Sequence, residues 1–341
     1  MDDPLSRMDS PLPRMDGLVA IDHEIAELEA KLREVKLRRQ QERKAMPEGY
    51  YEYCAPHEQR QHFLILLSDS ALPLGSFAFS SGLESFLAHD KAAASTAAKA
   101  ALAAAANALP LRAKHGPDAF AEFLPLSVSS YAHASLPFVL AAHDAAIPVL
   151  KPLTSTANRP STALDAFTAA LIQLDDTYDA TIICTVGRRA SVAQGRALLS
   201  IWERSFASAL TTTSAPDPLK PFARVVKQTS NPPPGTLSEA SAHMPPLFGA
   251  VAALAGLDRR QTADVFVLAH IKALLSAAVR ANLLGPYQAQ KMLASGAVQR
   301  LATRAVEDTW EMSVDEAGQT VPVVDLWMGR HEMLYSRIFN S

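Results

Sequence analysis

The feature that most constrains the fold is the spacing of the apolar residues, which is helical over most of the chain. Between residues 18 and 35, for example, apolar residues recur in steps of three and four, which is the spacing of one helix face. No region alternates convincingly with the period of two that a half-buried strand requires. Alanine dominates the apolar set, and it is the best helix former but a weak core filler. We therefore predict an all-α protein whose helices pack closely through small side chains.

The 341 residues divide by composition into an N-terminal extension and one larger domain. Residues 1–17 contain three prolines and a glycine, and we expect them to be disordered. Residues 18–55 are predicted to form a helical extension and a linker. The short heptad-like seam in this extension fits either a coiled coil or a solvated helix stacked on the body. Residues 56–341 are predicted to form a single helical-bundle domain.

Prolines and low-complexity stretches interrupt the predicted helices of this domain. Seven prolines between residues 110 and 160 predict short helices separated by loops. An alanine-rich stretch at about 91–110 is helical by propensity, and a proline-containing stretch at 211–237 is predicted to form a long loop. We expect the chain to end in an amphipathic helix over about residues 325–339.

Charge and cysteine content favour a cytoplasmic protein. The formal net charge of −3 provides no basic field for nucleic acid or a membrane surface. Cys54 and Cys184 are far apart and form neither a disulfide framework nor a CxxC metal site, which favours a reducing compartment. The acidic, proline-broken N-terminus does not resemble a secretory signal. No run of 18 or more apolar residues predicts a membrane span.

The motifs that bind nucleotides or create an activated serine are missing. The sequence contains no GxGxxG and no GxxxxGK[ST], so we expect no phosphate-cradling loop and no GTP or ATP bound through one. The serine-rich stretch at 66–84 lacks the GxSxG spacing of a nucleophile elbow. We therefore predict neither a catalytic residue nor a directly bound cofactor.

The sharpest enzyme-like signal is the cluster Asp175, Asp176 and Asp179 in LDDTYDA. Carboxylates with this spacing on a helix can converge on Mg²⁺ and a diphosphate, as in the DDxxD motif of all-α isoprenoid synthases. A partial second motif follows at Glu307, Asp308, Glu311 and Asp315. An all-α, magnesium-dependent isoprenoid synthase is therefore the alternative function. The other interpretation makes Asp175 and Asp176 solvated or helix-capping carboxylates and not a metal site.

The stretch LLSDSALPLGSFAFSSGLE at 66–84 is better explained by docking than by catalysis. Pro73 and Gly75 turn the chain, and Gly82 permits another backbone to approach closely. Phe77 and Phe79 offer large apolar area at low entropic cost, which suits an interface, although at least one ring is expected in the core. Ser81 and Glu84 have the spacing of a capping box.

Five segments occur in a definite order along the chain: LLSDSALPLGSFAFSSGLES, RRASVAQGRALLSIWERSF, HMPPLFGAVAALAGLD, AAVRANLLGPYQAQ and RHEMLYSRIFNS. In this order they resemble the urease accessory protein family UreF. The resemblance covers roughly residues 56–341 and leaves the N-terminal 55 residues outside. Relative to this family, the stretches at about 91–110 and 211–237 are insertions. Together with the N-terminal extension they suggest a eukaryotic, fungal member.

The resemblance implies an all-α, dimeric maturation factor without enzymatic activity. Proteins of this family join the accessory protein UreD, also called UreH, to the GTPase UreG, and the assembly delivers nickel to apo-urease. In this frame nickel passes through the complex and the partner GTPase binds the GTP. A third possibility, a chain that carries nickel itself, lacks a supporting cluster of His and Cys residues.

The resemblance also suggests which residues contact partners. Arg280 and Arg337 match basic positions of the family and can grip a carboxylate or phosphate bidentately, unless they form internal ion pairs. The final residues 331–341 are expected to dock on the UreD-type partner or on the core of the chain itself. The complete predicted partner-binding set is Asp69, Pro73, Gly75, Phe77, Phe79, Gly82, Glu84, Arg280, His331, Tyr335, Arg337 and Phe339.

Overall fold

The computed structural model describes residues 27, 30, 31, 57–69, 72, 78–90, 116–150, 160–210, 216–229 and 239–340. The chain divides into two compact units, Met1–Tyr51 and Glu52–Ser341. Within the first unit, the described residues are helical, and Lys31 Nζ lies 2.8 Å from Glu27 Oε1, one helical turn away. The predictions for residues 1–17 and 91–110 lie outside the described residues, as does the prediction for 18–55 apart from residues 27, 30 and 31.

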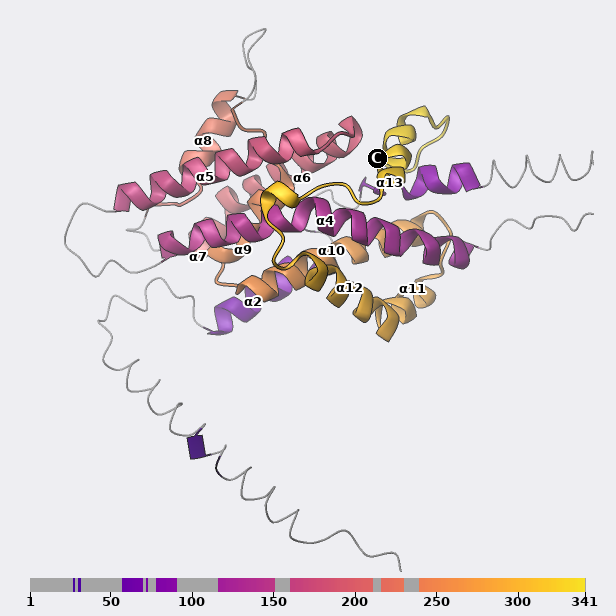
Figure 1. Ribbon diagram of the computed structural model, residues 1–341, viewed down its shortest axis with the longest axis horizontal. Coiled ribbons are helices and arrows are strands. Elements are labelled where there is room, and N and C mark those ends of the chain that lie inside the picture. The colour runs from indigo at the N-terminus through magenta and orange to yellow at the C-terminus, as the bar shows by residue number, and fades with distance from the viewer. Residues whose placement is uncertain are drawn as a thin grey trace, which may run out of the picture. The chain divides into compact units, whose positions relative to one another are not determined.

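The regular secondary structure among the described residues of the second unit is helical, and these residues contain no strand (Figure 1). The all-α prediction is thus confirmed. Residues 83–90 are helical as well. The other helices are α2 (His57–Leu67), α4 (Gly116–Leu150), α5 (Pro160–Thr181), α6 (Thr185–Ile201), α7 (Ala207–Leu210), α8 (Lys220–Thr229), α9 (Met244–Leu254), α10 (Arg259–Arg280), α11 (Pro286–Leu293), α12 (Gly296–Thr309) and α13 (Pro322–Arg330), with a π-helical turn at Trp202–Phe206 and 3₁₀ turns at Val314–Glu316 and His331–Met333.

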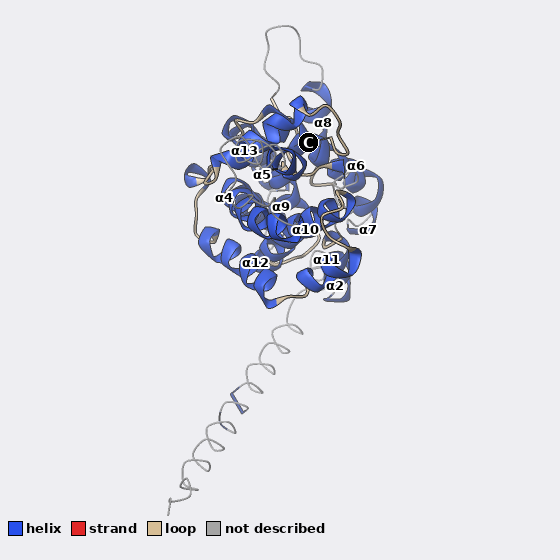
Figure 2. Cartoon of the chain, turned by 90° about the vertical axis from the view of Figure 1, so that its right-hand side faces the viewer, coloured by secondary structure: helices blue, strands red, loops and turns tan. Residues whose placement is uncertain are grey.

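Helix α9 forms the centre of this unit, and all of its residues are buried. It packs chiefly against α4 and also contacts α5, α6 and α10, which surround it in Figure 2. Two glycines make this packing possible. A Cβ at Gly249 would collide with the carbonyl oxygen of Val139 in α4, and a Cβ at Gly195 in α6 would collide with the carbonyl oxygen of Ala242. Small residues therefore set the helix spacing, as the alanine-rich composition predicts.

Helix α4 corrects the prediction of short helices between residues 110 and 160. It runs unbroken from Gly116 to Leu150 with Pro125, Pro137 and Pro148 inside it. Each proline lacks one backbone donor and costs about 3 kcal/mol in an ordinary helix interior. Along α4, burial of large side chains such as Phe120 and Phe123 contributes about 1.5–3 kcal/mol each and offsets that penalty.

Helix α8 corrects the prediction that residues 211–237 form a loop. Its buried residues Phe222, Ala223 and Val226 have helical spacing and face the core. Pro221 lies in the first turn, where a proline removes no intrahelical hydrogen bond. Just before the helix, the Asp217 carboxylate accepts hydrogen bonds from the backbone N–H of Leu219 and the Trp202 indole. Residues 211–215 and 230–237 of the predicted loop lie outside the described residues.

The predicted C-terminal helix over 325–339 is correct only in its first part. Helix α13 ends at Arg330, a 3₁₀ turn follows, and residues 334–340 are not helical. The reason is that the tail forms hydrogen bonds with another segment. The backbone N–H of Asn340 donates to the carbonyl of Ala78. The Glu84 carboxylate accepts hydrogen bonds from the backbone N–H groups of Ile338 and Phe339. An amide with these partners is not available to an intrahelical bond.

Two helices, α4 and α10, are long and apolar enough to cross a membrane by length and composition. Half or more of the most apolar window of each helix is buried inside the fold, 50% for α4 and 56% for α10. Both helices contact each other and the central α9. Their apolar character is accounted for by their place in the core.

Candidate functional site

The candidate site is built from two segments that are far apart in sequence, residues 78–90 and the C-terminal segment 322–340. Of the predicted partner-binding residues, Pro73, Gly75 and Phe77 lie outside the described residues. Asp69 is exposed just after α2, and Phe79 is half-buried. Most of the remaining predicted residues gather where these two segments meet.

Glu84 connects the two segments. Its side chain accepts hydrogen bonds from the backbone N–H groups of Ile338 at 2.7 Å and Phe339 at 3.2 Å. A third contact joins it to Nε2 of His331 at 2.8 Å, and the His331 ring is completely buried. The predicted capping box with Ser81 is therefore wrong, because the Glu84 carboxylate is directed at the C-terminal segment.

Phe339 and Arg280 form the second contact of the tail. The Phe339 ring is buried, and the Arg280 guanidinium lies over it at 4.5 Å from the ring centroid. Burial lowers the pKa of the Arg280 guanidinium. A guanidinium over an aromatic face is attracted by the ring quadrupole. Arg280 and Phe339, both predicted to contact partners, thus contact each other.

Gly82 shows why a glycine is required in this region. Its φ of +87° lies in the left-handed region, and an added Cβ would be 3.2 Å from the backbone N of Met328 and 3.3 Å from Cβ of Trp327. The prediction that Gly82 admits another backbone is confirmed, and that backbone is α13 of the same chain. The aromatic rings of Phe86, Phe123 and Trp327 pack together beside this contact.

The outer side of the C-terminal segment is apolar and exposed. Tyr335 is fully exposed and Arg337 is exposed as well. Of the eight large apolar side chains that are exposed among the described residues, five lie between positions 323 and 338, namely Val323, Leu326, Met333, Tyr335 and Ile338. Single exposed apolar residues are ordinary, whereas a concentration of them indicates an interaction surface.

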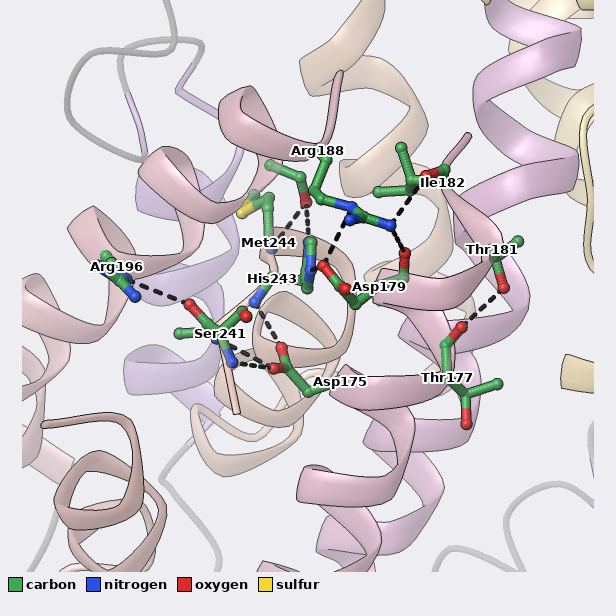
Figure 3. A network of polar contacts seen from close by, with 12 residues as sticks. Asp175, Thr177, Asp179, Thr181, Ile182, Arg188, Arg196, Ser241, His243 and Met244 are labelled. Atoms are coloured by element: carbon green, nitrogen blue, oxygen red, sulfur yellow. Dashed lines mark hydrogen bonds and ion pairs between the residues drawn. The ribbon is translucent and has the colours of Figure 1, made fainter. Parts of the chain in front are cut away.

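A second polar cluster contains Asp175 and Asp179 of the LDDTYDA motif (Figure 3). Asp175 is buried, and its carboxylate accepts hydrogen bonds from the backbone N–H groups of residues 241, 242 and 243 at 2.5–3.0 Å. It therefore fixes the segment that leads into α9, as a capping carboxylate would. Asp176, the adjacent residue, is exposed. The capping interpretation fits Asp175 and the solvated one fits Asp176.

His243, which sequence reasoning missed, connects Asp179 to Ser191 inside the fold. Its Nε2 is 2.9 Å from the Asp179 carboxylate and its Nδ1 is 3.1 Å from Ser191 Oγ. Arg188 Nε lies 3.3 Å from the same carboxylate, and Ser191 Oγ also accepts from the N–H of Met244. The i,i+4 spacing of Asp175 and Asp179 places both on one helix face, which is the signal that could have predicted their common neighbour.

The described residues contain no group of three or more His, Cys, Asp or Glu side chains that could hold a metal ion. The polar clusters instead hold segments of the chain together, and the exposed apolar side chains concentrate in one segment. A helical fold with this distribution of side chains is typical of proteins that bind partners through their surface.

The comparisons with known proteins specify this class further. The model of the UreF family matches residues 114–297, more than half of the chain. An uncharacterized urease accessory protein UreF-like from Schizosaccharomyces pombe is 30% identical over 280 residues, which are 82% of this chain and 97% of that protein. Urease accessory protein 6 of Cryptococcus neoformans is 26% identical over an alignment that covers 84% of this chain and 98% of that protein. Urease accessory protein F of rice is 28% identical, covering 80% and 82%.

The chain belongs to the UreF family of urease accessory proteins. This membership supports a role in urease maturation and participation in a urease accessory complex. It also fits a protein that is not an enzyme, because its relatives are named accessory proteins.

Proposed function

We propose that this chain is a cytoplasmic scaffold of urease maturation that joins a UreD-type (UreH-type) accessory protein to a UreG-type GTPase. In this proposal the assembled complex delivers nickel into apo-urease, and the chain acts as a homodimer that gates GTP hydrolysis by the partner. Nickel is the cargo of the complex, and GTP binds to the GTPase. The chain itself catalyses no reaction and holds no cofactor.

The observation that carries the proposal is the exposed apolar side of the C-terminal segment. Ile338 and Tyr335 are exposed, whereas the neighbouring Phe339 is buried. The Glu84 carboxylate accepts hydrogen bonds from the backbone N–H groups of Ile338 and Phe339. A segment fixed in this way presents its apolar side chains with little loss of entropy on binding, because the fold has already ordered them. We assign this surface to the UreD-type partner.

The alternative of an isoprenoid synthase receives no support from the aspartate cluster. The Asp175 carboxylate already accepts hydrogen bonds from three backbone N–H groups. Asp176 lies on the exposed side of α5. Three carboxylates that share a Mg²⁺ ion must converge on one point. These aspartates divide between the interior and the surface.

Co-expression with UreD- and UreG-type proteins tests the scaffold proposal. We expect a ternary complex to co-purify, and we expect the isolated chain to turn over no GTP. Measurable GTP turnover by the chain alone, or failure to retain either partner, would contradict the proposal.

Two matched pairs of variants test the assignment of the surface. Ile338→Ser is compared with Ile65→Ser, since both isoleucines are 62% exposed and Ile65 lies on α2. Tyr335→Ser is compared with Tyr287→Ser on α11, another largely exposed tyrosine. We expect only the variants at 338 and 335 to weaken binding of the UreD-type partner, by about tenfold or more if they are interface hot spots.

These variants separate partner binding from folding better than a truncation does. Removal of residues 331–341 also deletes the buried Phe339 and the His331 contact with Glu84, so the truncated chain loses stability for an internal reason. The surface substitutions should leave the melting temperature unchanged. Equal partner affinity across both matched pairs would refute the assignment of this surface.

A further inference from the structure

A cavity of about 150 Å³ lies between helices α4, α5, α6, α9, α10 and α13. Its volume is comparable to that of an engineered protein cavity that accepts benzene. That engineered cavity is lined by aliphatic and aromatic residues, whereas this one also has polar groups on its wall. Residues of both segments of the candidate site, such as Phe79 and Asp325, line the cavity, whereas neither Glu84 nor the exposed apolar side chains of the C-terminal segment belong to the wall.

Hydroxyl groups of the cavity wall can accept hydrogen bonds from a ligand. Ser130 donates its hydroxyl proton to Gln319 Oε1 at 2.6 Å, and Ser135 shares a hydrogen bond of 2.9 Å with the Tyr178 hydroxyl. A serine has one donor and two acceptor lone pairs. Ser130 has committed its proton to Gln319, so its oxygen can only accept further bonds. This oxygen therefore favours a ligand that donates.

Aromatic rings supply the apolar part of the wall. Phe79, Tyr131, Tyr178, Phe248 and Phe266 all line the cavity. Tyr131 stacks on His270 at 3.9 Å and on Phe266 at 4.9 Å between ring centroids. The faces of such rings carry negative quadrupole charge and attract cations. A cation with N–H groups would suit both these rings and a hydroxyl oxygen that accepts hydrogen bonds.

The charges on the wall are of one sign. Among the described lining residues, Asp325 is the only carboxylate, and neither lysine nor arginine is present. Burial lowers the pKa of His270 to about 3, so that imidazole is neutral at physiological pH. Burial also raises the pKa of Asp325, although a hydrogen bond from Gln319 opposes the change. A partly buried carboxylate without a cationic partner is unfavourable, and a bound cation would relieve this.

We propose that this cavity binds a small organic ammonium ion, with its apolar body against the aromatic rings and its N–H groups directed at Asp325 and the wall hydroxyls. A divalent metal ion is the poorer occupant. Ca²⁺ and Mg²⁺ require about six oxygen ligands, with several carboxylates or waters among them, and the described wall offers one carboxylate. The ligand is therefore expected to be a primary amine with an apolar body about as large as a benzene ring.

Benzylammonium and benzyl alcohol form a matched pair of probes, because they share the aromatic body and differ in the charged group. Isothermal titration of the full chain at neutral pH should show that benzylammonium binds at least about tenfold more tightly than benzyl alcohol, as expected when a charge-assisted hydrogen bond replaces a neutral one. Equal affinity of the two probes would overturn the proposal.

Two variants locate the binding. Asp325→Asn should remove the preference for benzylammonium, whereas Asp176→Asn, the same substitution on the exposed side of α5, should retain it. Ala134→Leu adds bulk to the cavity wall and should abolish binding of both probes, which keeps the test decisive if Asp325→Asn fails to fold.

Unchanged benzylammonium affinity in Asp325→Asn or in a folded Ala134→Leu would show that the probe binds elsewhere and would overturn the proposal. Tight binding of Ni²⁺ that Asp325→Asn abolishes would assign the cavity to a metal ion instead. None of these measurements involves a partner protein, so their outcome is independent of the scaffold proposal.

Discussion

The neutral, buried His270 should make the stability of the fold depend on pH in a way that one substitution removes. The ring lies in α10, where it stacks on Tyr131 and its Nε2 is 3.1 Å from Ser127 Oγ. Burial lowers its pKa to about 3. In the unfolded chain a histidine has a pKa of about 6.5. The folded state therefore resists a protonation that the unfolded state accepts.

The size of the effect follows from the two pKa values. Above about pH 6.5 neither state binds the proton, and the stability associated with neutral His270 is fully present. Between pH 6.5 and about 3 the unfolded chain holds one more proton than the folded chain. The free energy of unfolding then falls by about 1.4 kcal/mol per pH unit, or about 2 kcal/mol between pH 6.5 and pH 5.

His270→Gln retains a polar group that can reach Ser127 but does not titrate. We expect the variant to lose a constant amount of stability at every pH, because the contact of the ring with Tyr131 is gone. Its additional loss on acidification should be smaller than that of the wild type by about 1.4 kcal/mol per pH unit below pH 6.5. The two stability curves should therefore converge as the pH falls.

Urea unfolding followed by circular dichroism at pH 7.5, 6.5, 5.75 and 5.0 measures this difference. The other histidines contribute equally to both proteins and cancel in the subtraction. His62→Gln, the same substitution on the exposed surface of α2, is the control and should not reproduce the change in slope. A difference between wild type and His270→Gln that stays constant over the whole range would refute the reasoning.

Three further substitutions have defined outcomes. Asp175→Asn weakens the bonds from three backbone amides and should reduce stability by about 2–4 kcal/mol, measured by urea unfolding, whereas exposed Asp176→Asn should change it by less than about 0.5 kcal/mol; equal effects would contradict the assigned roles. Glu84→Gln should expose the C-terminal tail to carboxypeptidase, detected by mass spectrometry, and a resistant tail would show that other contacts hold it. Asp325→Asn should raise the melting temperature at pH 7, because the folded state disfavours the charged carboxyl, and the gain should vanish near the unfolded pKa of about 3.9; a lower melting temperature at pH 7 would contradict it.

The helical class could be predicted from the sequence, because helical periodicity is local. The first part of the predicted C-terminal helix was also correct, since α13 ends at Arg330. Proline signals were less reliable. Pro137 lies inside α4 and Pro221 in the first turn of α8. Tertiary burial and position within the helix decide whether a proline breaks it, and neither is visible in a local pattern.

The candidate site could be predicted as a set of residues but not as an arrangement. Glu84, Arg280, His331 and Phe339 were selected individually as partner contacts. In the folded chain they contact one another. A side chain that bonds across more than 200 positions leaves no periodic trace in the sequence. The pairing of Asp179 with His243 was also missed: the spacing of Asp175 and Asp179 indicates a shared helix face, but it does not identify a partner 64 positions away.

Two of the segments that carry the family resemblance, at 66–85 and at the C-terminus, meet in the fold through residues 78–84 and 331–340. The backbone of Asn340 bonds to Ala78, and the Glu84 carboxylate holds the amides of Ile338 and Phe339. Consecutive side chains of the non-helical tail then differ in environment, since Phe339 is buried and Ile338 is exposed. The tail can therefore be docked on its own core and still offer an apolar surface to a partner, so the two roles predicted for it are compatible.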